Sequence, residues 1–196
     1  MTKLFLYKAR DAPIVAILRR GAVKDIWELI QWNTDTDTFT RGQWLTKAVM
    51  NGAYNSISPD GRHFAYFYSS TRDVFKSYAV ISEIPHFTAS LITDHHAGCW
   101  DAISFDTDGA VIHTQSSLGF TKKRPCDLPI RAHFDESRRY TGFVESFTDS
   151  RGRNITVAGA TILANGTLLY DTTSHTFQSV ACPIEPLAAD EVVFPT

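Results

Sequence analysis

Ser58-Pro59-Asp60-Gly61 decides the fold, because this tight turn joins two apolar segments with the character of β-strands. Tyr54-Asn55-Ser56-Ile57 precedes the turn, and His63-Phe64-Ala65-Tyr66-Phe67-Tyr68 follows it. Glycine takes the positive φ that such a turn requires, while an aspartate caps the local backbone. The stretch therefore predicts a β-hairpin with Gly61 at positive φ.

Two later turns repeat this pattern of strand, Asp-Gly or Asn-Gly, and strand. They are Asp106-Thr107-Asp108-Gly109 and Asn165-Gly166. The three glycines stand 48 and then 57 residues apart. A repeat of this length, with one hairpin in each unit, is typical of stacked four-stranded blades. We therefore expect an all-β, β-propeller-like fold of about four blade-equivalents or an incomplete ring, as a single domain over residues 1–196.

Strand-like segments outnumber helical ones along the whole chain. Most are short, rich in β-branched or aromatic residues, and bounded by Gly, Pro, Asn or Asp. Val23–Trp32 fits one helical face as well as strand alternation, and we interpret it as a strand. The other predicted strands are Lys3–Lys8, Ile14–Arg19, Gly52–Ser58, Arg62–Ser69, Ser77–Ile84, Thr88–Thr93, Cys99–Phe105, Ala110–Gln115, Tyr140–Phe147, Ala160–Ala164 and Thr167–Asp171.

The hairpin at Ser58–Phe67 resembles the core of the propeller repeats of TolB-like and WD40-like proteins. A longer run is similar to a group of uncharacterised bacterial proteins: Trp27–Trp32, Thr38-Phe39, Gly42–Trp44 and Ser58–Gly61. The resemblance covers roughly the first half of the chain and afterwards only the turns, and it implies a fold without implying an activity. The Gly-His and Trp-Asp signatures of WD40 repeats are absent from their expected places.

Composition excludes several classes of protein. Hydrophobic residues make up 43% and charged residues 20%, as in an ordinary globular domain, and the net charge of −2 argues against nucleic acid or an anionic membrane as partner. The three cysteines form no C-x-x-C pair, and the N-terminus has no long apolar run. We therefore expect a cytoplasmic protein, monomeric or homodimeric, whose partner is a protein or an unknown small ligand.

One loop gathers the densest set of potential ligand-binding side chains. Asp94, His95, His96 and Cys99 lie within it, Trp100 begins the predicted strand that follows, and His113 is a more distant member. Asp94, His95, His96, Trp100 and His113 are the candidates for ligand binding. Adjacent histidines on a strand point to opposite faces, and no second ligand pair stands at a recognised zinc spacing. We therefore assign these five residues to ligand binding and expect no bound metal and no cofactor.

Two acidic stretches resemble calcium loops only superficially. Asn33–Asp37 has Thr38 where the loop needs a glycine, and Trp44 where it needs a bidentate glutamate. Asp106–Gly109 is too short to supply six oxygens. We interpret both as capped turns. The four tryptophans could stack on a flat or sugar ligand, but they alternate with other apolar residues on strands, and we assign them chiefly to the core, with Trp100 also a candidate for ligand binding.

No motif for nucleophilic catalysis or phosphate binding occurs in the sequence. We therefore expect a binding or protein-interaction module without evident catalytic machinery. The alternative is a hydrolase-like enzyme whose site uses scattered Asp and His residues on strand ends. A third alternative is a purely structural assembly subunit. Finally, the strand-like Val192-Val193-Phe194 is expected to close the fold by pairing beside Leu4-Phe5-Leu6, because an unclosed ring leaves open strand edges.

Overall fold

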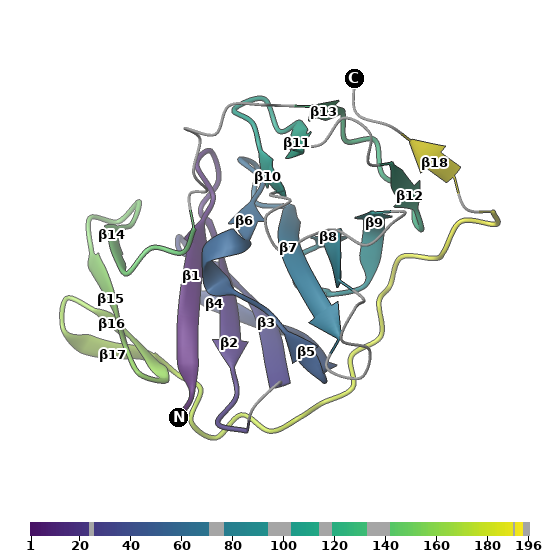
Figure 1. Cartoon of the computed structure of the whole chain (residues 1–196). Helices are drawn as coiled ribbons and strands as arrows, with labels where there is room; N and C mark the ends of the chain where they lie inside the picture. Colours follow the sequence, from purple (N-terminus) through teal and green to yellow (C-terminus); the bar gives the residue numbers. More distant parts are fainter. Residues whose placement is uncertain are drawn as a thin grey trace.

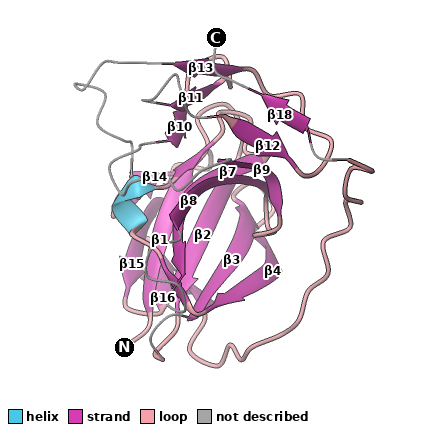
Figure 2. Ribbon diagram, turned by 45° about the vertical axis from the view of Figure 1, so that its right-hand side comes forward, coloured by secondary structure: helices cyan, strands magenta, loops and turns pink. Residues whose placement is uncertain are grey.

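The described residues form four β-sheets (Figures 1 and 2). The computed structural model describes residues 1–23, 26–70, 77–93, 103–113, 119–132, 142–189 and 191–193. Within these ranges the chain is all-β: its single helical element is a 3-10 turn at Gly52–Tyr54, and none of the four sheets closes on itself. The described part holds no helix long and apolar enough to cross a bilayer.

Sheets A and D are four-stranded antiparallel meanders. In sheets B and C, strands that are distant in the sequence lie side by side. Sheet A consists of β1 (Lys3–Lys8), β2 (Ile14–Arg20), β3 (Ile26–Asn33) and β4 (Thr38–Thr46). Sheet B runs in the order β18 (Glu191–Val193), β12 (Phe120–Lys122), β9 (Ala89–Thr93), β8 (Ser77–Glu83), β7 (His63–Ser70) and β5 (Ala48–Val49), with β6 (Ser56–Ile57) also paired to β7. Sheet C contains β10 (Ile103–Phe105), β11 (Val111–His113) and β13 (Ile130–Ala132), the last two parallel. Sheet D contains β14 (Ser146–Thr148), β15 (Asn154–Ala158), β16 (Thr161–Ala164) and β17 (Thr167–Asp171).

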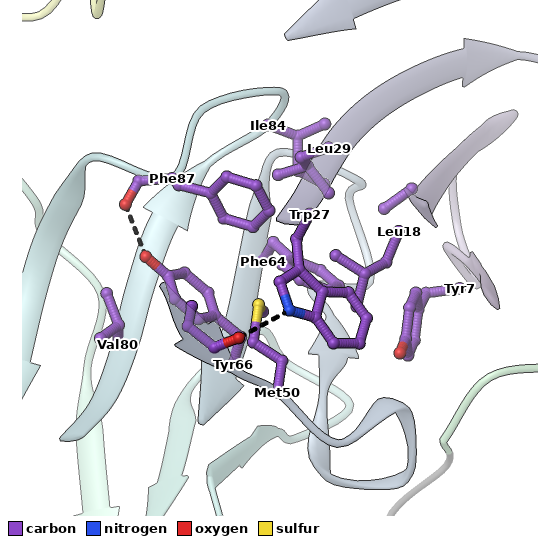
Figure 3. Close-up of a cluster of buried hydrophobic side chains, with 12 residues drawn as sticks. Tyr7, Leu18, Trp27, Leu29, Met50, Phe64, Tyr66, Val80, Ile84 and Phe87 are labelled. Atoms are coloured by element: carbon purple, nitrogen blue, oxygen red, sulfur yellow. Dashed lines mark hydrogen bonds between the residues drawn. The ribbon is translucent and has the colours of Figure 1, made fainter. Parts of the chain in front are cut away.

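One face of sheet A packs on sheet B through an aromatic core (Figure 3). Tyr7, Leu18 and Trp27 come from sheet A, and Phe64 and Tyr66 come from sheet B. The indole of Trp27 donates to the Ala48 carbonyl at 3.0 Å, and the Tyr66 hydroxyl donates to the Phe87 carbonyl at 2.5 Å. The buried polar atoms of these two side chains are thus satisfied inside an otherwise apolar interface.

The other faces of sheets A and B carry one further sheet each. Leu6, Ile30 and Trp32 of sheet A pack against Ile155 and Ile162 of sheet D. On the far side of sheet B, a third cluster joins it to sheet C; its members include Phe67, Ile81, Phe120, Ile103 and Val111. Strand alternation makes this possible, since successive side chains point to opposite faces. The sheets therefore stack in the order D, A, B, C.

The three predicted turns are confirmed. Gly61, Gly109 and Gly166 have φ values of 74°, 86° and 79°, and each joins the two strands of an antiparallel hairpin. Gly61 is constrained twice, because a Cβ there would also lie 2.6 Å from the Cβ of Ile14. That position therefore demands glycine for its backbone and for the packing of sheet A on the hairpin.

Several strand boundaries differ from the prediction, while the type of element is mostly right. Val23–Trp32 is a strand as interpreted, beginning at Ile26. Gly52–Ser58 is only partly a strand, because the Asn51 side chain accepts from the Ala53 amide at 3.0 Å and caps a 3-10 turn instead.

The predicted pairing of the C-terminal strand is wrong. β18 pairs antiparallel with β12, placing Val193 opposite Phe120, so it extends sheet B and not sheet A. Phe194 lies outside the described residues. The outer edge of β1 is met instead by Val144, whose amide donates to the Leu6 carbonyl at 2.8 Å. The sequence had correctly marked the segment as a strand that covers an edge, but its partner is a strand that the sequence analysis did not identify.

Candidate functional site

The predicted ligand-binding loop lies almost wholly outside the described residues. This holds for Asp94, His95, His96 and Trp100. His113 ends β11, where its backbone pairs with Ile103 and Ala132, and its side chain is not described. The assignment of these five residues therefore stays a prediction.

The acidic turns are capped as predicted. The Asn33 side chain accepts from the Asp35 amide at 3.0 Å, and the Asp108 carboxylate accepts from the Ala110 amide at 3.1 Å. Asp37 forms salt bridges to Arg153 at 2.7 Å. In the part of the chain that the structure describes, no three His, Cys, Asp or Glu side chains are grouped to hold a metal ion.

Sheets A, B and C and the segment that leads into β14 border one cavity of about 500 Å³, here called the central cavity. Figure 1 shows β6 beside β1, with β10 close to β6 and β7. The lining residues are Tyr7–Arg10 from sheet A, Ile57 and Pro59 from the β6–β7 hairpin, Phe105–Thr107 from the β10–β11 hairpin, and Gly142 and Val144 just before β14. The volume lies within the range of about 300–1,000 Å³ that is usual for small-ligand sites.

Two cations border the central cavity. The Arg10 guanidinium donates to the Asp11 carboxylate at 2.7 and 2.5 Å and to the Thr107 carbonyl at 2.5 Å. Hydrogen bonding between them raises the pKa of Arg10 and lowers that of Asp11, so both remain ionised. Within the described ranges the Nη1 group of Arg10 has no hydrogen-bond partner. The Lys8 ammonium lies 5.8 Å from the centre of the Phe147 ring.

Tyr7, which lines the central cavity, is a structural group. The Tyr7 hydroxyl donates to the Gly52 carbonyl at 2.7 Å and accepts from the Asn55 amide at 3.1 Å. Burial raises the pKa of Tyr7 far above its ordinary value, which keeps the phenol protonated. Its proton is already committed to a carbonyl, so it is a poor acid or base. The arrangement suits binding of a ligand with an apolar body and an anionic group.

A smaller and more polar cavity of about 280 Å³ lies at one end of sheet B, here called the polar cavity. Asp60, His63, Glu83 and Cys126 are among the residues that line it. His63 is only 8% exposed, and its Nδ1 atom has no hydrogen-bond partner in the described structure. Burial lowers the pKa of His63, against the opposing charges of Asp60 and Glu83, and burial raises the pKa of the Cys126 thiol. His63 is therefore held neutral and Cys126 protonated near pH 7.

A buried ionic cluster lies between sheets A and D. Glu28 is fully buried, with Arg41 Nε at 2.7 Å, Arg19 Nη1 at 3.6 Å and His175 Nδ1 at 3.1 Å from its carboxylate oxygens. The Tyr170 hydroxyl lies 3.4 Å from His175 Nε2. Burial lowers the pKa of Arg19, partly offset by Glu28. Because its groups bond chiefly to one another, we assign this cluster a structural role: it fastens the chain that follows β17 to sheet A.

Sequence reasoning missed both cavities for different reasons. The central cavity is lined by common residues such as Ile57, Pro59 and Val144, which carry no local motif. The polar cavity begins within the Ser58–Gly61 hairpin itself, where Asp60 and His63 were read only as turn and strand residues. Comparison of the chain with protein-family models, curated proteins and solved structures found no match.

Proposed function

We propose that the protein is a non-catalytic binding module, that its four sheets form a propeller-like incomplete ring, and that the central cavity is its ligand site. Two observations support the ring. Sheets D, A, B and C stack face to face, and sheets A, B and C, together with the segment that leads into sheet D, line the same cavity. A shared opening at the meeting point of stacked blades is where propeller-like proteins have their central channel.

The kind of ligand is inferred from the walls of the central cavity, which combine apolar surface with cationic groups. Ile57, Phe105 and Val144 form apolar surface, while Lys8 and Arg10 supply N–H donors. The nearby Asp106 carboxylate lies 3.9 Å from Arg131, which offsets its charge. The ligand is therefore a small organic anion whose apolar part fills the cavity and whose charged group contacts Lys8 and Arg10.

A fluorescent apolar anion, 8-anilinonaphthalene-1-sulfonate, is a suitable probe. Arg10→Gln and Lys8→Gln should each weaken its binding, and together they should raise the dissociation constant about tenfold. Arg62→Gln is the matched control, because Arg62 is an exposed arginine of the β6–β7 hairpin with a side chain 69% accessible. Circular dichroism checks that the variants are folded. Unchanged binding by the double variant would show that the central cavity is not the anion site.

A hydrolase-like enzyme acting at the polar cavity is the second candidate, favoured by the buried and unpartnered Nδ1 of His63 near Glu83 and Asp60. The high pKa of the Cys126 thiol weighs against nucleophilic catalysis there. Hydrolysis of p-nitrophenyl acetate by the intact protein, abolished by His63→Gln, would establish this function in place of the binding module. We expect the intact protein and the His63→Gln variant to hydrolyse the ester at the same rate.

A further inference from the structure

Among the described residues, only one pairs with the outer edge of β1. β1 is the edge strand of sheet A, and the hydrogen bond from the Val144 amide to the Leu6 carbonyl shows that Leu6 turns its backbone groups away from β2. In an antiparallel ladder this orientation alternates, so the N–H and C=O groups of Leu4 point to the same side. Within the described ranges, Val144 is the only residue that meets this edge, and the Leu4 backbone has no partner there.

The open backbone of Leu4 faces a groove of about 610 Å³, here called the edge groove. One wall is Met1–Phe5, and the other is formed by Phe143–Ser146 together with Thr156, Val157 and Gly159 of sheet D. The groove exists because the chain that bridges β1 at Val144 leaves this edge two residues later to form β14. It shares only Val144 with the central cavity.

We propose that the edge groove binds an extended segment of another protein, which adds to sheet A as a fifth strand antiparallel to β1. Unpaired donors and acceptors on an edge strand are the recognised template for strand addition. The new strand would continue the pairing that Val144 begins at Leu6. A groove with walls on both sides admits a single strand, whereas a second copy of this chain would bring its whole sheet A with it.

The walls define the chemistry of the incoming segment. A residue opposite Leu4 exchanges both backbone hydrogen bonds with it and points towards the apolar wall at Val157. The next residue lies opposite exposed Lys3 and is therefore acidic, and the preceding one lies opposite the Phe5 ring and is aromatic.

The peptide acetyl-Phe-Val-Asp-Thr-Ser-amide, which begins opposite Phe5, is the probe, followed by NMR with ¹⁵N-labelled protein. We expect the Leu4 amide to shift and to exchange more slowly with solvent as the peptide binds. Methylating the valine nitrogen of the peptide removes its donor to the Leu4 carbonyl and should abolish binding at the same concentration. Lys3→Glu should weaken binding about threefold, and exchanging the peptide's Asp for Lys should restore it. Arg62→Glu, remote from the groove, should have no effect.

Three results would overturn this proposal: no response at Leu4 up to millimolar peptide, equal binding of the methylated peptide, or protection of Leu4 without peptide in a dimer of this chain. The Arg10→Gln variant separates this test from the proposed function, because it should bind the peptide normally while losing affinity for the apolar anion.

Discussion

Sheet A has two faces that are held to their neighbours by different physical means. The face towards sheet B is an aromatic core whose polar atoms bond to backbone carbonyls, as Trp27 does to Ala48. The face towards sheet D is apolar in the middle, at Ile30 and Trp32, but has charged groups at its two ends. Apolar burial is nearly independent of pH, whereas paired charges are not. The two interfaces should therefore respond differently to the same perturbation.

The charged ends of the interface between sheets A and D are distinct. At one end is the buried cluster around Glu28. At the other, Arg153 donates to Asp37 of the β3–β4 turn and to Asp149 of the β14–β15 turn, at 2.7 Å in each case. Because these two turns belong to different sheets, Arg153 acts as a clamp between sheets A and D.

The largest effect is expected in the core between sheets A and B. Phe64→Ala removes a fully buried ring that packs edge-on against Tyr7 at 5.0 Å between centroids. The lost burial and the cavity left behind should lower the free energy of unfolding by about 4 kcal/mol. Urea denaturation measures this value. Phe177→Ala is the control, since that ring is 58% exposed and its removal should cost less than about 0.5 kcal/mol. Equal losses would refute the assignment of this cluster as the main core.

Glu28→Gln should give the second-largest loss in the free energy of unfolding. The substitution keeps the shape of the side chain and removes the charge that compensates buried Arg19 and partly buried Arg41. Removing one charge from such a buried cluster should lower the free energy of unfolding by about 3 kcal/mol. Hydrogen exchange should show the loss first at the amides of sheet D. Glu145→Gln, at an exposed position, is the control. If the two variants had the same free energy of unfolding, the cluster would have no structural role.

The smallest effect is a selective loosening of sheet D in acid. Hydrogen bonds from Arg153 lower the pKa of Asp37. At Asp149, burial raises the pKa, but hydrogen bonds from Arg153 outweigh burial and the pKa is lowered as well. A lowered folded-state pKa stabilises the protein above the unfolded value of about 4, and this contribution is lost as the pH falls through the folded-state value. Amides of β15 and β16 should therefore lose protection below about pH 4 before those of β7 and β8. Simultaneous loss would show that the clamp carries no net stability. Arg153→Met should remove the difference.

The sequence predicted the elements that have regular patterns. Lys3–Lys8 and Thr167–Asp171 are strands with the predicted bounds, and the three glycine turns have the predicted backbone. It missed β4, because Arg41, Gly42 and Gln43 interrupt the alternation and the pairing of β3 with β4 shifts register between Glu28 and Ile30. A bulge of this kind changes which side chains share a face, and a simple period of two cannot reveal it.

The candidate sites were less accessible to sequence reasoning. Glu28 lies between Ile26 and Ile30 on one face of a strand, which marks an ordinary amphipathic surface position, yet it is fully buried and His175, from the chain that follows sheet D, contacts it. The position of sheet D over sheet A is a long-range contact with no local signal. The same is true of the central cavity, whose wall residues come from four hairpins or strand ends separated by most of the chain.

The packing of sheet D on sheet A sets an order of events during synthesis. Ile155 follows Trp32 by 123 residues. At the usual rate of translation, Trp32 is therefore made on the order of ten seconds before the Ile155 side chain that covers it. During that time the nascent chain presents Ile17, Ile30 and Trp32 to solvent or to a chaperone as an uncovered apolar stripe. A ribosome stalled before residue 142 leaves that stripe open indefinitely. The first sheet to be made is therefore the part of this protein most exposed to aggregation while the chain is incomplete.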